Sequence, residues 1–226
     1  MVARRLLVAA VLVTVAFVFT SVAARPSTTA RAPAVYRLRG DPRLCPSPMC
    51  GGFWASRVNR TKAICLDGVA RAACYAASVD LSALTSPARN HARPALSTGR
   101  ALVTGAFARY SNEFPQLAQL VATRVWLAAG GAGDTGTVYL VVDTGLRCIR
   151  APCFSLRATA VNSTSSLTLS NLDLAGTGAS AAAIARANAT LAHGGVLASG
   201  AIRAAAKPSV SGIGRTLAAT QVWLPA

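Results

Sequence analysis

Two short runs near the middle of the chain resemble the turn that carries the catalytic aspartate of aspartic proteases. Residues 141–145 read Val-Val-Asp-Thr-Gly, and residues 134–136 are a second Asp-Thr-Gly. In those enzymes two aspartates share a proton and activate water. Asp134 and Asp143 are too close in sequence to occupy equivalent loops of two lobes. We therefore interpret the runs as a linker turn and a strand-ending turn, and keep a hydrolase that uses Asp143 as a remote alternative.

Six cysteines offer two further kinds of chemistry, disulfides and zinc binding. Cys45 and Cys50 are separated by four residues, and so are Cys148 and Cys153, a spacing that suits either use. A secretory route would oxidise these thiols. We favour disulfides and keep a zinc site shared by the two pairs as the alternative.

Other motifs that could do chemistry are sparse. Residues 39–41 form the adhesion tripeptide Arg-Gly-Asp, with no further feature that supports adhesion. His91 and His193 are the only histidines, and neither has a second plausible metal ligand near it in the sequence. No nucleophile elbow or phosphate-binding loop occurs, and only seven acidic residues are present. We predict no catalytic residue, no cofactor and no metal site.

Three acceptor sequons suggest glycosylation at Asn59, Asn162 and Asn188, if the host glycosylates. Asn59 and Asn162 each follow a predicted strand, where a surface loop is expected. Asn188 is expected near the apolar face of a predicted helix.

The chain is strongly basic, with 23 basic against 7 acidic residues and a formal net charge of +16. Such a field attracts polyanions, including nucleic acid, acidic polysaccharide or an anionic membrane surface. The arginines are scattered, with neither a long basic run nor interleaved aromatic residues, and this disfavours specific nucleic-acid binding.

The first residues have the layout of a secretory signal peptide. Arg4 and Arg5 precede an apolar run that ends in small residues, which predicts a signal peptide over residues 1–24 and secretion. An uncleaved membrane anchor is the alternative. Residues 25–34 are predicted to be a disordered lead-in. After cleavage we expect no membrane span.

The rest of the sequence contains an internal repeat. A framework made of a tyrosine, two cysteines and a Val-Asn pair recurs at one fixed offset: Tyr36, Cys45, Cys50, Val58 and Asn59 match Tyr139, Cys148, Cys153, Val161 and Asn162. A unit of this length suits a small domain. We predict repeat domains at residues 35–129 and 138–226, joined by a linker at residues 130–137.

The repeat also assigns the disulfides. The second copy holds only Cys148 and Cys153, so these two should bond each other if the domains are independent. By equivalence Cys45 pairs with Cys50, which leaves Cys65 with Cys74. Residues 65–74 have no counterpart in the second copy and are predicted to be an inserted, stapled loop.

Strand signals dominate both copies. Ten strands are predicted, five in each copy, at residues 35–39, 53–58, 75–81, 101–107, 120–127, 138–142, 154–161, 166–174, 195–202 and 216–224. One helix is expected at residues 179–193, between the third and fourth strands of the second copy. The equivalent residues 82–99 contain Pro87 and Pro94 and are predicted to be a loop. The predicted fold is mainly β (α+β), with two tandem five-stranded domains that are barrel-like or sandwich-like.

Residues 36–81 resemble a known family. The motif Cys45-Pro-Ser-Pro-Met-Cys50-Gly-Gly, with Val58-Asn59 and the Cys65–Cys74 segment, is similar to a domain of unknown function, number 6748. The second copy follows it more loosely, with Phe154-Ser155 in place of the two glycines. The resemblance implies a secreted bacterial protein, and the family brings no known activity with it.

These features favour a secreted, non-enzymatic binding or structural module. The ligand is unknown, with an extracellular polyanion or cell-surface component as the expected partner. The alternative is a protease inhibitor that presents the Pro-containing disulfide loop around Pro48 and Met49.

Overall fold

The computed structural model describes residues 32–131, 133–205 and 212–226, which belong to one compact unit. The predicted signal peptide, residues 1–24, and residues 25–31 of the predicted lead-in lie outside the described residues. None of the helices in the described part of the chain is long and apolar enough to cross a membrane.

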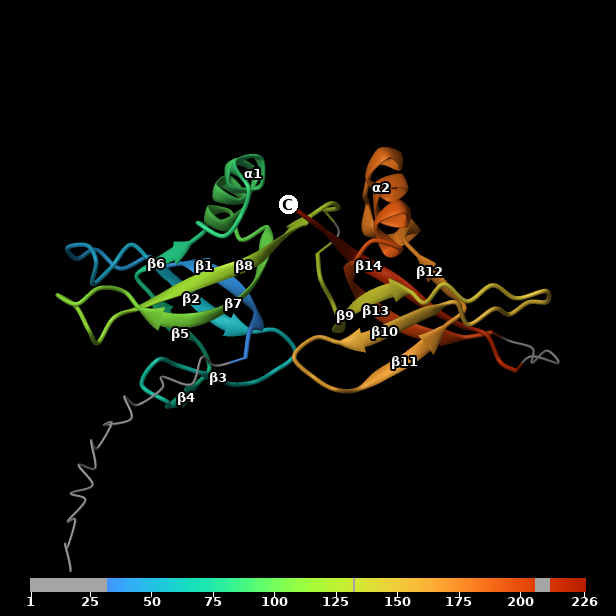
Figure 1. The fold of residues 1–226 in the computed structure, drawn as a ribbon, viewed down its shortest axis with the longest axis horizontal. Coiled ribbons are helices and arrows are strands. Elements are labelled where there is room, and N and C mark those ends of the chain that lie inside the picture. Colours follow the sequence, from blue (N-terminus) through green and yellow to red (C-terminus); the bar gives the residue numbers. More distant parts are fainter. Residues whose placement is uncertain (1–31, 132, 206–211) are drawn as a thin grey trace, which may run out of the picture. The chain divides into compact units, whose positions relative to one another are not determined.

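All ten predicted strands are present (Figure 1). The first half contains β1 (Ala34–Gly40), β2 (Phe53–Arg57), β5 (Cys74–Ala76), β6 (Ser78–Asp80), β7 (Ala101–Arg109) and β8 (Ala118–Ala128). The second half contains β9 (Thr137–Asp143), β10 (Leu156–Ala160), β11 (Ser166–Leu169), β12 (Asn171–Asp173), β13 (Val196–Ala204) and β14 (Arg215–Pro225). The inserted loop forms its own small hairpin, β3 (Ala63–Ile64) with β4 (Ala70–Arg71).

The third predicted strand of each half is split in two. After β5 pairs with β2, the chain continues as β6, which lies parallel to β8. In the second half β11 pairs with β10, and β12 then lies parallel to β14. Each break is needed because the strand leaves one neighbour and joins another.

One sheet runs through both halves of the chain. Its hydrogen-bonded order is β11-β10-β9-β13-β14-β8-β7-β1-β2-β5, and this order does not return to its starting strand. The predicted mainly β fold is confirmed, and the sheet is not closed along this order. A barrel-like or sandwich-like form of each half stays a prediction. The halves meet where β14 pairs with β8, and the predicted division into two independent domains stays a prediction.

The described residues form two α-helices, of which only the second was predicted. Helix α2 (Ala181–Leu191) is capped at its N-terminus by Ser180, whose side chain accepts a hydrogen bond from the Ala183 amide. Helix α1 (Ser86–Ser97) occupies the stretch predicted as a loop. Pro87 stands in the first turn, where it costs little, and a buried face of Ala88, Ala92 and Leu96 offsets the missing amide of Pro94. Each helix packs on the strands of its own half (Figure 1).

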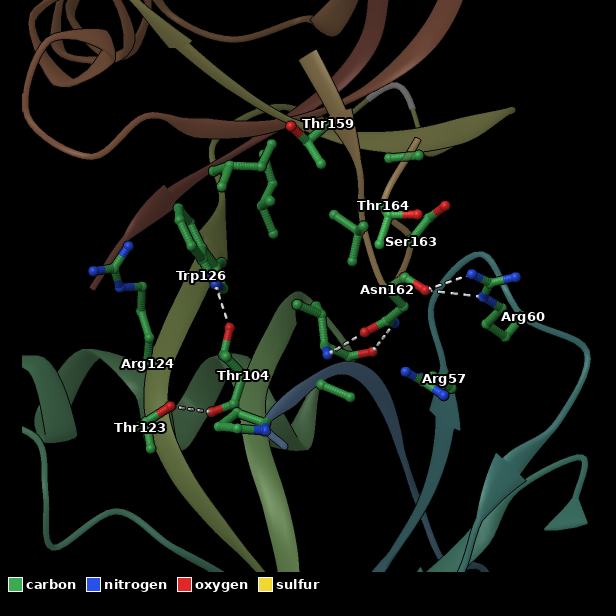
Figure 2. Close-up of a pocket in the computed structure, with 17 residues that line it drawn as sticks. Arg57, Arg60, Thr104, Thr123, Arg124, Trp126, Thr159, Asn162, Ser163 and Thr164 are labelled. Atoms are coloured by element: carbon green, nitrogen blue, oxygen red, sulfur yellow. Dashed lines mark hydrogen bonds between the residues drawn. The ribbon is translucent and has the colours of Figure 1, made fainter. Parts of the chain in front are cut away.

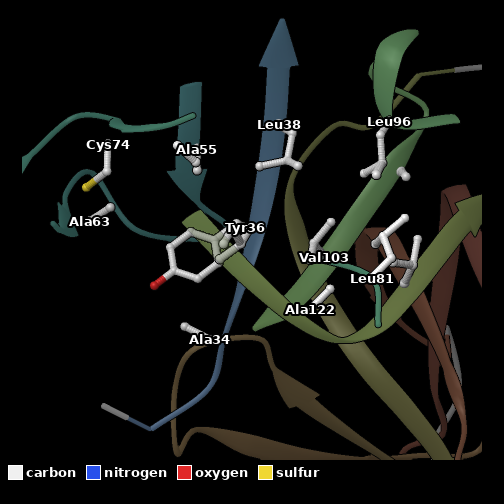
Figure 3. Close-up of a cluster of buried hydrophobic side chains, with 14 of the residues drawn as sticks. Ala34, Tyr36, Leu38, Ala55, Ala63, Cys74, Leu81, Leu96, Val103 and Ala122 are labelled. Carbon is white, nitrogen blue, oxygen red and sulfur yellow. The ribbon is translucent and has the colours of Figure 1, made fainter. Parts of the chain in front are cut away.

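Two apolar clusters form the cores of the halves, and a third joins them. Figure 3 shows the first, which contains Tyr36, Leu38 and Val103 of the sheet and Leu96 of α1. The joining cluster takes matched residues from both halves: Val58, Leu102, Trp126, Val138, Val161, Leu197 and Trp223. Burial of this apolar area stabilises the junction between the halves.

Candidate functional site

The cysteines form three local disulfides, Cys45–Cys50, Cys65–Cys74 and Cys148–Cys153. These are the pairs that the repeat predicts, so the zinc alternative has no free thiolates to use. In the described residues no group of three His, Cys, Asp or Glu side chains is arranged to hold a metal ion.

The first disulfide loop is held by a network around Asp41. Arg43 forms an ion pair with Asp41 at 2.9 Å, and the Trp54 indole donates a hydrogen bond to the same carboxylate at 3.2 Å. The Arg43 guanidinium lies 5.2 Å from the Trp54 ring centroid and 4.9 Å from that of Tyr75. The Asp41 side chain is 0% exposed, so the Arg-Gly-Asp tripeptide does not offer its carboxylate to a partner.

We expect this network to open under acid conditions. The Arg43 hydrogen bond holds the pKa of Asp41 at about 2, below its value of about 3.9 in an unfolded chain. Because the folded pKa is the lower one, the contribution of Asp41 to stability is full above about pH 4 and is lost as the pH falls through about 2. NMR titration of the carboxyl carbon should show a midpoint near 2 in the protein and a higher one in Arg43→Gln. A native midpoint near 4 would contradict the network.

The second disulfide loop has its own ion pair, at positions not equivalent to the first. Two nitrogens of Arg147 donate to the Asp143 carboxylate at 3.0 and 2.9 Å, and the Gly145 amide donates at 2.8 Å. The Arg147 hydrogen bond lowers the pKa of Asp143. Asp41 and Asp143 do not align between the two halves of the sequence, so the repeated framework gives no signal of this shared feature.

The two aspartates of the protease-like runs are held apart by a strand. Asp134 precedes β9, and Asp143 ends it, so roughly 20 Å of extended chain separates them. Each is paired with a different arginine, Arg37 and Arg147. Two carboxylates in this arrangement cannot share a proton.

Most carboxylates of the chain have structural partners. Four of the seven acidic residues form ion pairs with arginine: Asp41, Asp67, Asp134 and Asp143. Asp80 accepts from the Ser82 amide at 2.8 Å, and Asp173 accepts from the Ala175 amide at 3.0 Å. These six groups stabilise turns and loops, which leaves few carboxylates for acid–base chemistry.

Asn59 and Asn162 bind the halves to each other. The Asn59 amide nitrogen donates to the carbonyls of Val138 and Val161 at 2.7 and 3.1 Å, and its oxygen accepts from the Val138 amide at 2.9 Å. Asn162 makes the equivalent bonds to the first half. Its amide nitrogen donates to the carbonyls of Val35 and Val58, and its oxygen accepts from the Val35 amide. We call these six bonds the asparagine clasp.

The clasp bears on the three sequons. A glycan on Asn59 or Asn162 would replace one of the two N–H donors that the clasp uses. Asn188 is exposed on α2, one turn after Ile184, which packs against the core of the second half. Of the three, Asn188 is therefore the sequon whose amide is most accessible.

A cleft of about 820 Å³ lies beside the clasp (Figure 2). Thr104, Thr123, Arg124 and Trp126 of β7 and β8 form one wall in the figure. The other wall contains Arg57 and Arg60, together with hydroxyl groups from the second half at Thr159, Ser163 and Thr164. None of the described residues that line the cleft is acidic.

Within the described residues, the three cleft arginines have no carboxylate partner. Two Arg60 nitrogens donate to the Asn162 carbonyl at 3.0 and 2.6 Å, and the Arg124 guanidinium lies 5.1 Å from the Trp126 ring centroid. The Nε of Arg57 is buried and makes no hydrogen bond in the described structure. The cleft therefore carries three positive charges that no carboxylate neutralises.

These arginines are not part of the repeated framework. At the positions of the second half that match Arg57, Arg60 and Arg124, the sequence has Ala160, Ser163 and Gln221. The second half folds into matching strands with these uncharged residues. The fold does not require the three charges, and this favours a role in binding.

The family model of a domain of unknown function, DUF6748, matches residues 34–226 of the chain. The chain belongs to this family. The DUF6748 match contains both halves, the clasp and the cleft, and it carries no activity. Comparison with curated proteins and with solved structures gave no match.

Proposed function

We propose that the chain is a secreted, non-enzymatic binding module that holds an anionic ligand of an extracellular surface in the cleft between its halves. The observation that carries this proposal is the set of three arginines, Arg57, Arg60 and Arg124, in a cleft without a carboxylate. Guanidinium groups bind carboxylate and phosphate oxygens with paired hydrogen bonds. Three local disulfides fit an oxidising extracellular setting.

We also propose that the two halves are tandem copies of one unit. In support, the strand pairs β1–β2, β1–β7, β7–β8 and β6–β8 of the first half match β9–β10, β9–β13, β13–β14 and β12–β14 of the second. The β3–β4 hairpin and its disulfide are additions to the first copy.

The first disulfide loop favours a binding module over a protease inhibitor, because its backbone groups at Met49 are already hydrogen-bonded within the protein. Its Met49 amide donates to the Pro46 carbonyl at 3.0 Å, and the Met49 carbonyl accepts from Arg43 at 3.0 Å. A protease would need these backbone groups to be free to pair with its own strands.

A charge-matched pair of variants tests the cleft. In the cleft variant, the arginines are replaced by their counterparts, as Arg57→Ala, Arg60→Ser and Arg124→Gln. In the surface variant, the exposed Arg93, Arg109 and Arg186 are replaced by glutamine, which removes the same charge. The probe is retention on heparin-agarose. We expect the cleft variant to elute at clearly lower salt than the surface variant, and retention of the unmodified protein to fall steeply with salt.

Equal elution of the two variants would show that the overall charge, and not the cleft, binds the probe. Retention that does not change with salt would remove the electrostatic basis of the proposal. Far-UV circular dichroism of both variants checks that they fold.

A further inference from the structure

We infer that the ligand of this cleft is an anionic amphiphile, a phosphate or carboxylate head group that carries an alkyl chain. This inference rests on the proposed function and narrows it. The head group would lie among the arginines, and the chain would lie on the floor of the cleft.

The floor of the cleft is apolar and comes from both halves. It is made of aliphatic and aromatic side chains: Val35, Trp126, Leu140, Val161 and Leu197. Trp126, Val161 and Leu197 belong to the cluster that joins the halves, and Val35 and Leu140 pack against that cluster while staying partly exposed. A polysaccharide laid on this floor would lose water from its hydroxyl groups without gaining partners there, whereas an alkyl chain would gain from burial.

The rim of the cleft supplies the complementary charge. Arg57 and Arg60 stand on the wall opposite Arg124 and Thr123 (Figure 2). Arg60 is held in place by the Asn162 carbonyl, so its position is set before a ligand arrives. A volume of about 820 Å³ with an apolar lining and a few charged groups is typical of small-molecule sites.

The equivalent position of the first half shows that the apolar floor is not a general property of the fold. Leu140 of β9 matches Arg37 of β1. Arg37 forms an ion pair with Asp134, and burial lowers the pKa of Arg37. At matching positions, the first half thus has an arginine in an ion pair, and the second half has an aliphatic side chain that lines the cleft.

The experiment compares alkyl phosphates of increasing length on the unmodified protein by isothermal titration calorimetry, below their micelle concentrations. The probes are inorganic phosphate, butyl phosphate and octyl phosphate, with octanoate as the carboxylate and octyl glucoside as the neutral amphiphile. We expect octyl phosphate to bind about tenfold more tightly than butyl phosphate, or more, since each buried methylene is worth up to about fourfold. Octyl glucoside should bind far more weakly. The comparison of octanoate with octyl phosphate identifies the preferred head group.

Leu140→Thr tests the floor, because threonine keeps strand propensity and removes most of the apolar surface. In this variant, the ratio of the dissociation constants of butyl and octyl phosphate should fall by about tenfold. The dissociation constant of inorganic phosphate should not change. The control is Ile202→Thr on β13, an exposed aliphatic residue outside the cleft, which should change neither.

Three other outcomes would each overturn either the amphiphile inference or the proposed function. If octyl and butyl phosphate bind equally while the cleft arginine variant still loses heparin retention, the amphiphile inference is overturned and the proposed function stands. If octyl glucoside binds as tightly as octyl phosphate, the head group is not recognised and the inference is also overturned. If no anion binds and the two arginine variants behave alike, the proposed function itself fails.

Discussion

Replacing Asn162 by alanine should lower the free energy of unfolding by about 3–5 kcal/mol, and Asn59→Ala should do the same. Each change removes three hydrogen bonds between the halves. Asn162→Ala takes this partner from the Val35 amide and the Val58 carbonyl, and Asn59→Ala takes it from the Val138 amide and the Val161 carbonyl. Each asparagine also has a positive φ, 57° for Asn59 and 59° for Asn162, which asparagine tolerates better than alanine. Urea unfolding followed by circular dichroism measures the loss.

Two control variants separate these causes. Asn162→Gly removes the same side-chain bonds but accepts the positive φ, so it should be less destabilising than Asn162→Ala by about 1 kcal/mol. Asn188→Ala, on the exposed face of α2, should change stability by less than about 0.5 kcal/mol. A loss below about 1 kcal/mol for both clasp alanines would show that the clasp does not hold the halves together.

Replacing Gly200 by valine should lower the free energy of unfolding by about 3 kcal/mol or more. Gly200 lies at the irregularity in the β13–β14 ladder, and a Cβ there would stand 2.8 Å from the Cα of Ala219. Gly105 occupies the matching irregularity between β7 and β8, where a Cβ would stand 3.2 Å from the Cα of Ala122, and Gly105→Val should show a similar loss. In both places the neighbour is backbone and has no free space to move into.

The control for the glycines is Gly40→Val at the end of β1, where a Cβ would meet no atom within 4 Å. It should change stability by less than about 0.5 kcal/mol, since valine suits a strand. Urea midpoints of the three variants give the comparison. If Gly200→Val unfolds within about 1 kcal/mol of the unmodified protein, the close backbone approach at the bulge is not a constraint.

The strands and the disulfides could be predicted from the sequence because both rest on local features. Alternating apolar residues specify the strands, and the repeat reduces the possible cysteine pairings to one set. Helix α1 was missed because Pro87 and Pro94 argue for a loop when the packing of Leu96 against the sheet is unknown. Tertiary burial outweighed local propensity there.

The candidate site could be predicted only in part. Arg57, Arg60 and Arg124 have no motif or spacing that brings them together, because their meeting depends on how the halves pack. The clasp did leave a signal, the recurrence of Val-Asn at one offset, but the following threonines directed the interpretation to glycosylation. A repeated asparagine that follows a strand is also a marker for a backbone position with positive φ.

The pairing of β8 with β14 has a consequence for the symmetry of the junction. Leu127 pairs with Leu224, its own counterpart in the repeat, while Trp126 pairs with Pro225 and Ala128 with Trp223. The asparagine clasp is reciprocal about the same point. In this strand pairing and in the clasp, each half thus contacts the other through equivalent positions, which is the defining property of an isologous dimer contact. The junction has the form of a two-fold homodimer interface enclosed within a single polypeptide.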